Sequence, residues 1–166
     1  MIAALPVLHE ENVRRALPEL TLTPRGCFLL CVGRSEAVRA RVEDALAERL
    51  GAGKAVVRGS LAGNRADLWR AMVREREGSG AAPEDTVLSF RLGEADPADL
   101  NRFGRLNMGR EARVLGRLRL MLWLDGFEEL NKFQREAPDL WVVRSDVQFY
   151  LSREDFEVPE VVGEVV

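Results

Sequence analysis

The residues best placed for chemistry are Gly33, Arg34 and Ser35. They follow the apolar run 27–32 and precede a helix-like segment at 36–50. Strand–turn–helix entrances of this kind hold anions, because backbone N–H groups and a positive side chain can converge there. A complete phosphate loop also needs several glycines, a lysine and a serine or threonine, which a three-residue turn cannot supply. We favour a tight turn with Ser35 as helix N-cap, and the alternative is a weak anion site using Arg34.

Two further strand ends bear on phosphate chemistry. Arg91 lies near the end of the predicted strand 86–92, where a nucleotide hydrolase would hold a carboxylate linked to its metal. A positive charge there opposes magnesium, so we predict that the chain does not hydrolyse ATP. Asp125 follows the apolar run 118–124 and joins the turn residues 33–35 as a weak ligand-binding set, to which we assign no catalytic role.

The third predicted helix carries polar residues inside its apolar stripe. Asn107, Arg110 and Glu111 occupy these positions. A buried charge without a partner is costly, so we expect a polar network, completed by backbone groups, Asp139 or Arg144. We favour a structural clamp between this helix and the C-terminal segment. A ligand-binding constellation is the alternative, since perturbed ionisable groups cluster at sites.

Other catalytic and metal-binding arrangements find little support. His9 is the only histidine, so neither a Ser-His-Asp triad nor a zinc site can be assembled convincingly. Cys27 and Cys31 are four residues apart in one predicted strand, roughly 13 Å at the usual rise, which is too far for a disulfide. We predict reduced core thiols, no metal and no cofactor.

Composition indicates one globular domain. The chain has 166 residues, of which 46% are apolar, and a net charge of −3. This charge does not favour nucleic acid, although Arg102, Arg105, Arg113 and Arg117 form an arginine-rich helix face. No apolar stretch reaches the length of a membrane span, and the N-terminus lacks the features of a signal peptide. The expected location is the cytoplasm.

Strand and helix patterns alternate along the chain. We predict strands at 27–32, 54–58, 86–92, 118–124 and 147–151, and helices at 10–17, 36–50, 65–77, 96–115, 126–137 and 139–143. This alternation predicts a three-layer α/β/α, Rossmann-like (P-loop NTPase-like) domain with about five mostly parallel strands. The run 118–124 is apolar throughout and should be a central strand. We divide the chain into a helical arm (1–23), the α/β domain (24–151) and an acidic tail (152–166).

Several helix ends have recognisable signals. Pro18 should stop the first helix, and Asp96 with Pro97 should start the helix at 96–115. Asp125 should cap the helix at 126–137, with Glu128 as its capping-box partner. In that helix Phe127, Leu130 and Phe133 should form the buried face.

Four short stretches carry a resemblance to a known family. They are Leu-Asn-Met-Gly-Arg-Glu at 106–111, Met-Leu-Trp-Leu at 121–124, Ala-Pro-Asp-Leu-Trp at 137–141 and Arg-Ser at 144–145. With them, the region 24–151 resembles the degenerate P-loop-like domain of bacterial STAND/AAA-type proteins, often found ahead of tetratricopeptide repeats. The resemblance implies a P-loop-like core used for regulation or assembly. This chain departs from the family in having no Walker signature and no repeats.

The sequence is compatible with three functions. The favoured one is a non-catalytic interaction or regulatory domain that docks on a protein partner or on a second copy of itself. The alternative is a nucleotide- or phosphometabolite-binding domain, weakly enzymatic at most, that uses the turn at 33–35. Nucleic-acid binding through the arginine-rich face is the least favoured, because the chain as a whole is acidic.

Overall fold

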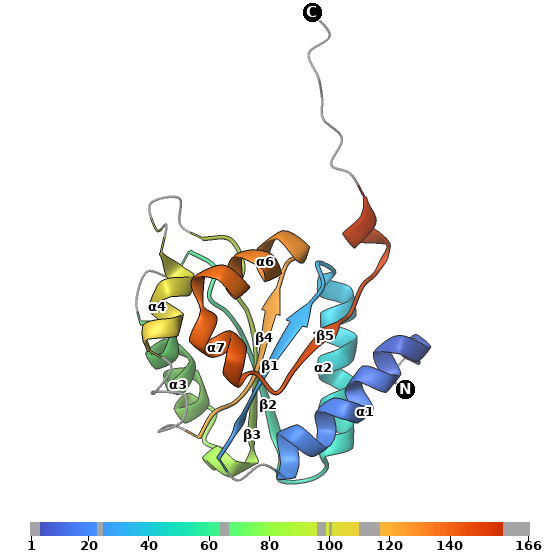
Figure 1. The fold of residues 1–166 in the computed structure, drawn as a ribbon. Helices are drawn as coiled ribbons and strands as arrows, with labels where there is room; N and C mark the ends of the chain where they lie inside the picture. The colour runs from blue at the N-terminus through green and yellow to red at the C-terminus, as the bar shows by residue number, and fades with distance from the viewer. Residues whose placement is uncertain are drawn as a thin grey trace, which may run out of the picture.

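Five parallel strands form a single sheet in the order β2-β3-β4-β1-β5 (Figure 1). The computed structural model describes residues 4–22, 25–63, 67–95, 99, 101–109 and 117–157. The strands are β1 (Cys27–Val32), β2 (Ala55–Ser60), β3 (Thr86–Arg91), β4 (Arg119–Leu124) and β5 (Asp146–Phe149). The α/β class and the parallel pairing predicted from the alternation of patterns are confirmed.

β4 is the middle strand, as its apolar sequence predicted. All six of its residues are buried, and Leu122 pairs with Leu30 of β1 on one side and Phe90 of β3 on the other. A parallel strand with neighbours on both edges and helices on both faces has no side that meets water. Its carboxyl end therefore delivers Asp125 to the centre of the sheet edge.

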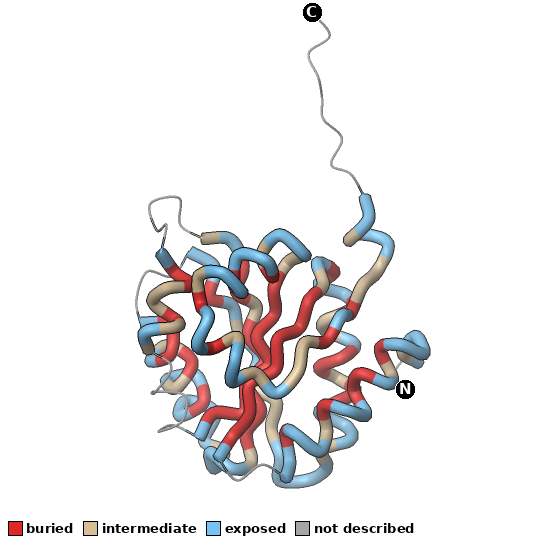
Figure 2. Tube along the Cα trace, viewed as in Figure 1, coloured by how far each residue is buried: buried red, intermediate tan, exposed pale blue. Residues whose placement is uncertain are grey.

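Helices cover both faces of the sheet in three layers (Figures 1 and 2). One face packs on α1 (Val7–Leu22) and α2 (Glu36–Leu50), and the other on α3 (Leu68–Gly78), α4 (Arg102–Met108), α6 (Phe127–Glu136) and α7 (Pro138–Val143). Alternate strand residues serve the two cores, so Leu29 packs with the first pair and Leu30 with the second set. α2 lies on the opposite face from the helices that follow β2, β3 and β4. The reason is that the crossover from β1 to β2 runs across the sheet in the opposite direction to the later crossovers.

The N-terminal helix is longer than the pattern predicted. We expected it to end before Pro18, but α1 continues to Leu22 with Pro18 inside. An internal proline costs about 3 kcal/mol, so tertiary contacts must compensate for it. Leu20 beyond the proline is buried, and its carbonyl accepts a hydrogen bond from Arg119 Nη1 at 2.7 Å. Packing on the domain has overridden the local stop signal.

The same helix covers the edge strand β5. Asn12 Nδ2 donates to the carbonyl of Phe149 at 2.8 Å, and Gln148 Nε2 donates to the carbonyl of Asn12 at 2.8 Å. His9 Nε2 hydrogen-bonds the carbonyl of Leu151 at 2.9 Å. Outward backbone groups of an edge strand invite pairing with other chains. Side chains of α1 satisfy the carbonyl of Phe149 in β5 and that of Leu151 just beyond the strand.

The helix predicted at 96–115 differs in its start. Residues 96–98, 100 and 110–116 lie outside the described part of the chain, and α4 begins only at Arg102. Asp99 and Asn101 are not helical, and the carboxylate of Asp99 accepts the N–H of Asn101 at 3.3 Å. Asp and Asn side chains compete for backbone groups in this way, which favours a turn before the helix.

None of the described helices is long and apolar enough to cross a membrane. Cys27 and Cys31 are both buried in β1 and are not joined by a disulfide, as predicted. After β5 the chain forms a single 3₁₀ turn, η2 (Arg153–Phe156), and residues 158–166 of the predicted acidic tail lie outside the described residues.

Candidate functional site

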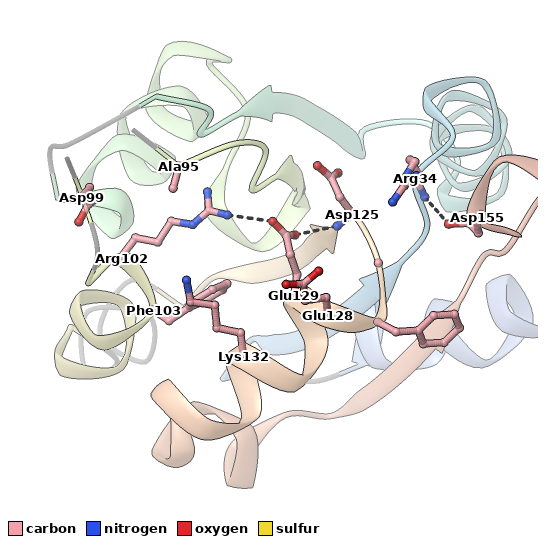
Figure 3. A pocket seen from close by; sticks show the side chains of 12 residues that line it. Arg34, Ala95, Asp99, Arg102, Phe103, Asp125, Glu128, Glu129, Lys132 and Asp155 are labelled. Carbon is pink, nitrogen blue, oxygen red and sulfur yellow. Dashed lines mark hydrogen bonds and ion pairs between the residues drawn. The ribbon is translucent and has the colours of Figure 1, made fainter. Parts of the chain in front are cut away.

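A cavity of about 400 Å³ opens at the carboxyl ends of β1, β3 and β4 (Figure 3). The crossovers that leave the neighbouring strands β1 and β4 go to opposite faces of the sheet, so a crevice forms between their first loops. Arg34 contributes from the β1 loop and Asp125 from the β4 loop. Arg102 and Lys132 line the far side, from α4 and α6. This volume suits a small molecule or a few side chains.

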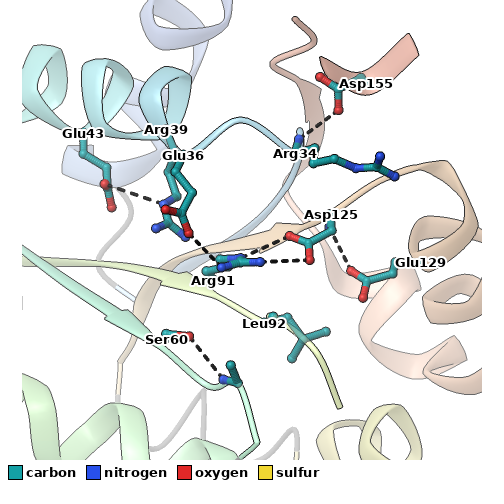
Figure 4. A network of polar contacts seen from close by, with 12 residues as sticks. Arg34, Glu36, Arg39, Glu43, Ser60, Arg91, Leu92, Asp125, Glu129 and Asp155 are labelled. Carbon is teal, nitrogen blue, oxygen red and sulfur yellow. Dashed lines mark hydrogen bonds and ion pairs between the residues drawn. The ribbon is translucent and has the colours of Figure 1, made fainter. Parts of the chain in front are cut away.

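Arg91 holds the loops beside the cavity together (Figure 4). Its Nε and Nη2 atoms lie 3.2 and 3.3 Å from the two carboxylate oxygens of Asp125, and Nη1 lies 2.8 Å from Glu36 Oε1. The hydrogen bonds with Asp125, helped by the negative charge of Glu36, raise the pKa of Arg91. Both oxygens of Asp125 are therefore engaged by the protein's own cation.

In the turn after β1, the Ser35 hydroxyl and the backbone of Gly33 are engaged by the fold. Ser35 Oγ accepts the N–H of Val38 at 3.2 Å, which is the N-cap geometry of the tight-turn interpretation. Gly33 donates its N–H to the carbonyl of Leu124 at 3.1 Å. A Cβ on Gly33 would lie 2.5 Å from the carbonyl oxygen of Tyr150, so the position requires the absence of a side chain.

The backbone N–H of Arg34 points to a carboxylate from the end of the chain. Asp155 Oδ1 accepts this N–H at 2.8 Å, although the two residues are 121 positions apart. The other oxygen, Oδ2, accepts the N–H of Ser152 at 2.8 Å and closes a capping box around η2. An internal carboxylate thus occupies the direction from which an external anion would approach this turn.

Helix α6 begins differently from the prediction. The N-cap is Gly126 and makes no side-chain cap, because the carboxylate of Asp125 is directed to Arg91. Glu129, and not Glu128, reaches back: its Oε2 accepts the N–H of Asp125 at 2.8 Å, while Oε1 accepts from Arg102 Nη2 at 3.0 Å. Burial raises the pKa of Glu129, against the effect of these hydrogen bonds.

Phe127 was predicted on the buried face of α6, and this was wrong. Its side chain is 45% exposed, whereas Leu130 and Phe133 are buried as expected. The Phe127 ring stacks on Phe149 at the end of β5, with 5.8 Å between ring centres. We call these two residues the aromatic pair.

The predicted arginine-rich face is not uniformly exposed. Arg102 is buried, and its Nη1 donates to the carbonyl of Gly93 at 2.6 Å. Arg105 pairs with Asp99, Arg113 lies outside the described residues, and Arg117 is exposed. Two of the four arginines are thus committed to internal contacts, which weakens the case for a phosphate-binding stripe.

Two cations of the cavity stand apart from these pairs. Within the described ranges, neither the guanidinium of Arg34 nor the ammonium of Lys132 forms an ion pair. Lys132 Nζ lies 5.9 Å from the ring centre of Phe103. These two side chains are the groups most available to a ligand.

The residues predicted as a buried polar network lie away from the cavity. Asn107 Oδ1 accepts the N–H groups of Asp139 and Leu140 at 2.9 and 3.1 Å, and its Nδ2 donates to Asp139 Oδ2 at 3.0 Å. Asn107 of α4 thus caps α7. Arg144 lies elsewhere and stacks on Trp141, with 3.8 Å from its guanidinium carbon to the ring centre. Arg110 and Glu111 lie outside the described residues.

Sequence reasoning missed Asp155, Glu129, Lys132 and the pairing of Glu36 with Arg91. Glu129 could have been found, since an acid four residues after Asp125 can reach back over one helical turn. Asp155 carried no such signal, because its contact depends on the path of the chain after β5.

Neither the scan against models of known protein families nor the search of curated proteins finds a match to this chain. The fold by itself is a parallel α/β arrangement that hosts many unrelated functions. Function must therefore be inferred from the residues of the cavity and its surroundings.

Proposed function

We propose that the chain is a non-catalytic interaction or regulatory domain that docks on a protein partner. The observation that carries this proposal is the engagement of Asp125 and Glu36 by Arg91. Phosphoryl transfer needs a bound metal ion and positive groups around the phosphate. Here a guanidinium sits between the two carboxylates, and Asp155 takes the N–H of Arg34. The protein itself therefore supplies the cation that these carboxylates face.

The sequence resemblance supports the same conclusion. Degenerate P-loop-like domains of the STAND/AAA type, ahead of tetratricopeptide repeats, are the family that the stretches at 106–111 and 137–141 resemble. The order β2-β3-β4-β1-β5 and the strand–turn–helix at 27–50 are compatible with such a core. We therefore assign the chain a scaffold role in which the framework of a nucleotide domain has been kept without its phosphate loop.

The aromatic pair is the surface we assign to docking. Phe127 is 45% exposed and Phe149 is 39% exposed, and the stacked rings lie at the carboxyl end of the sheet beside the cavity. Aromatic side chains dominate the binding energy of protein interfaces because they bury a large rigid area. A charged cavity next to an aromatic platform offers a partner both specificity and affinity.

Site-specific photo-crosslinking tests this assignment. Benzoylphenylalanine in place of Phe127 should capture a defined partner in cells, and the same label in place of Arg41, exposed on α2 across the sheet, should not. Phe149→Ala should reduce the yield from position 127 without unfolding the protein. Equal labelling from both positions, or a strictly monomeric protein without a product, would contradict the proposal.

A second candidate function is the binding of a small phosphate-bearing ligand. The observation that favours it is the cavity with Arg34 and Lys132 on its wall. Calorimetry with a panel of nucleotides and sugar phosphates decides between the two. Micromolar binding of any of them would favour this second function, and millimolar or absent binding would remove it.

A further inference from the structure

The C-terminal turn, residues 152–157, returns from β5 to the cavity. Asp155 bridges two segments there: Oδ1 accepts from the N–H of Arg34 at 2.8 Å, and Oδ2 accepts from the N–H of Ser152 at 2.8 Å and from its hydroxyl at 3.3 Å. Hydrogen bonds within the turn therefore orient the Asp155 carboxylate toward the loop after β1. Figure 3 shows this contact on the opposite side of the cavity from Arg102 and Lys132.

The other carboxylates around the cavity are mostly engaged. Three are held by arginines: Asp125 by Arg91, Glu129 by Arg102 and Asp99 by Arg105. Among these other lining residues, Glu128 is the carboxylate that no arginine holds. The cations of Arg34 and Lys132 also line the cavity and form no ion pair with any described residue. When Asp155 leaves, it uncovers the backbone N–H of Arg34 beside the guanidinium of the same residue, and Lys132 lies across the cavity. An uncovered N–H donor beside a cation favours an incoming carboxylate over an incoming cation.

Apolar surface adjoins the same place. Phe127 lines the cavity together with Asp155, and its ring is stacked on Phe149. In the turn itself Asp155 is followed by Phe156, which is 69% exposed. The surroundings of Arg34 therefore suit an acidic residue that has an apolar neighbour.

We propose that the C-terminal turn is an internal competitor for an acidic segment of the protein partner. The partner's carboxylate takes the place of Asp155 on Arg34, and its apolar neighbour packs on the aromatic pair. This inference rests on the proposed docking function and adds the chemistry of the partner. A tethered competitor acts at a high effective concentration, so the turn is displaced in only a small fraction of the molecules. The partner's apparent affinity is its intrinsic affinity multiplied by that fraction.

The test uses the full chain labelled with ¹⁵N and compares wild type, Asp155→Ala and Glu154→Ala. The last two remove the same charge from the same turn, but only Asp155 contacts Arg34. The probe is an acetylated peptide, Leu-Ser-Arg-Glu-Asp-Phe-Glu, which copies residues 151–157. Its binding is followed by the amide resonances of Gly33 and Arg34. A second peptide with Asn in place of Asp serves as the matched control.

We expect Asp155→Ala to reach half saturation at a peptide concentration at least about tenfold lower than wild type. This factor corresponds to a rise from about one tenth to nearly all in the fraction of molecules whose Arg34 N–H is open to the peptide. Glu154→Ala should behave as wild type, and the Asn peptide should not shift Arg34. Identical titrations of the three proteins would overturn the proposal. So would a variant whose Arg34 amide responds to inorganic phosphate but not to the acidic peptide.

This result is distinguishable from the docking result itself. If crosslinks form from position 127 but Asp155→Ala has no effect on peptide binding, the docking function is supported and the internal competitor is contradicted. Asp155→Asn, which keeps one acceptor oxygen, should fall between wild type and the alanine variant. If Asp155→Asn binds the peptide as weakly as wild type while Asp155→Ala binds it more tightly, the hydrogen bond to Arg34, and not the charge of Asp155, holds the turn in place.

Discussion

Arg91 and Asp125 meet in a two-point ion pair across the ends of β3 and β4. The Nε–Oδ1 and Nη2–Oδ2 distances are 3.2 and 3.3 Å, and the third donor, Nη1, reaches Glu36 at the start of α2. A planar guanidinium suits such a fork better than an ammonium does. The pair and its contact with Glu36 tie the ends of β3 and β4 to the start of α2 at one point of the sheet edge.

Arg91→Ala should therefore destabilise the domain. It leaves two carboxylates facing each other without their shared cation, and we expect a loss of about 1–3 kcal/mol in the free energy of unfolding in urea. Arg91→Lys keeps the charge and should lose less. Arg41→Ala, on an exposed α2 position, is the control and should change stability by less than about 0.5 kcal/mol. A neutral result for Arg91→Ala would show that the network contributes no stability.

The stability of the protein should depend on pH through Glu43. This residue of α2 is buried against the sheet, and burial raises its pKa above the ordinary value of 4.5, despite Ser89 and nearby arginines. The folded state therefore holds its proton more tightly than the unfolded chain. The resulting stability is present below about pH 4.5 and is lost as pH rises through the raised pKa.

Glu43→Gln isolates this effect, since it keeps the shape and removes the titration. We expect its stability relative to wild type to increase between pH 4 and pH 8, as measured by chemical unfolding at each pH. Glu48→Gln, exposed on the same helix, should give a flat difference. A flat difference for Glu43→Gln as well would mean that the buried carboxyl titrates normally.

The cap provided by Asn107 should be measurable. Its amide oxygen accepts two N–H groups at the start of α7, so Asn107→Ala leaves both without this partner. We expect a loss of about 1–2 kcal/mol in the free energy of unfolding. Met108→Ala is the comparison, because that neighbouring side chain is exposed. Equal stabilities of the two variants would argue against a capping role.

Gly33→Ala should be costly for a steric reason. The new Cβ would lie 2.5 Å from the carbonyl oxygen of Tyr150, so the loop after β1 must move away from the end of β5. We expect a loss of about 1–3 kcal/mol. Gly126→Ala is the matched control, since a Cβ there meets nothing within 4 Å. Thermal unfolding of both variants gives the comparison, and a tolerated Gly33→Ala would mean that the loop is adaptable.

Local patterns predicted some elements to the residue. β1 and α2 have the bounds predicted, because an apolar run, a serine cap and a glycine with φ of 85° at position 51 act within a few residues. β4 was recognised as central from its apolar sequence. These signals reflect backbone hydrogen bonding and burial, which neighbouring residues determine.

Contacts between distant residues decided the remainder. Pro18 failed to end α1 because Arg119, 99 positions away, holds the carbonyl of Leu20. Asp125 became a partner of Arg91 instead of a helix cap, since strand order places β3 beside β4.

The sequence was therefore sufficient to predict the fold class and most strands and helices, and it contains no phosphate-loop motif. The cavity, its ion pairs and the contact of Asp155 with Arg34 arose only in three dimensions. They depend on strand order and on the path of the chain after β5, and a charge selects its partner by proximity in space, which no local pattern of residues encodes.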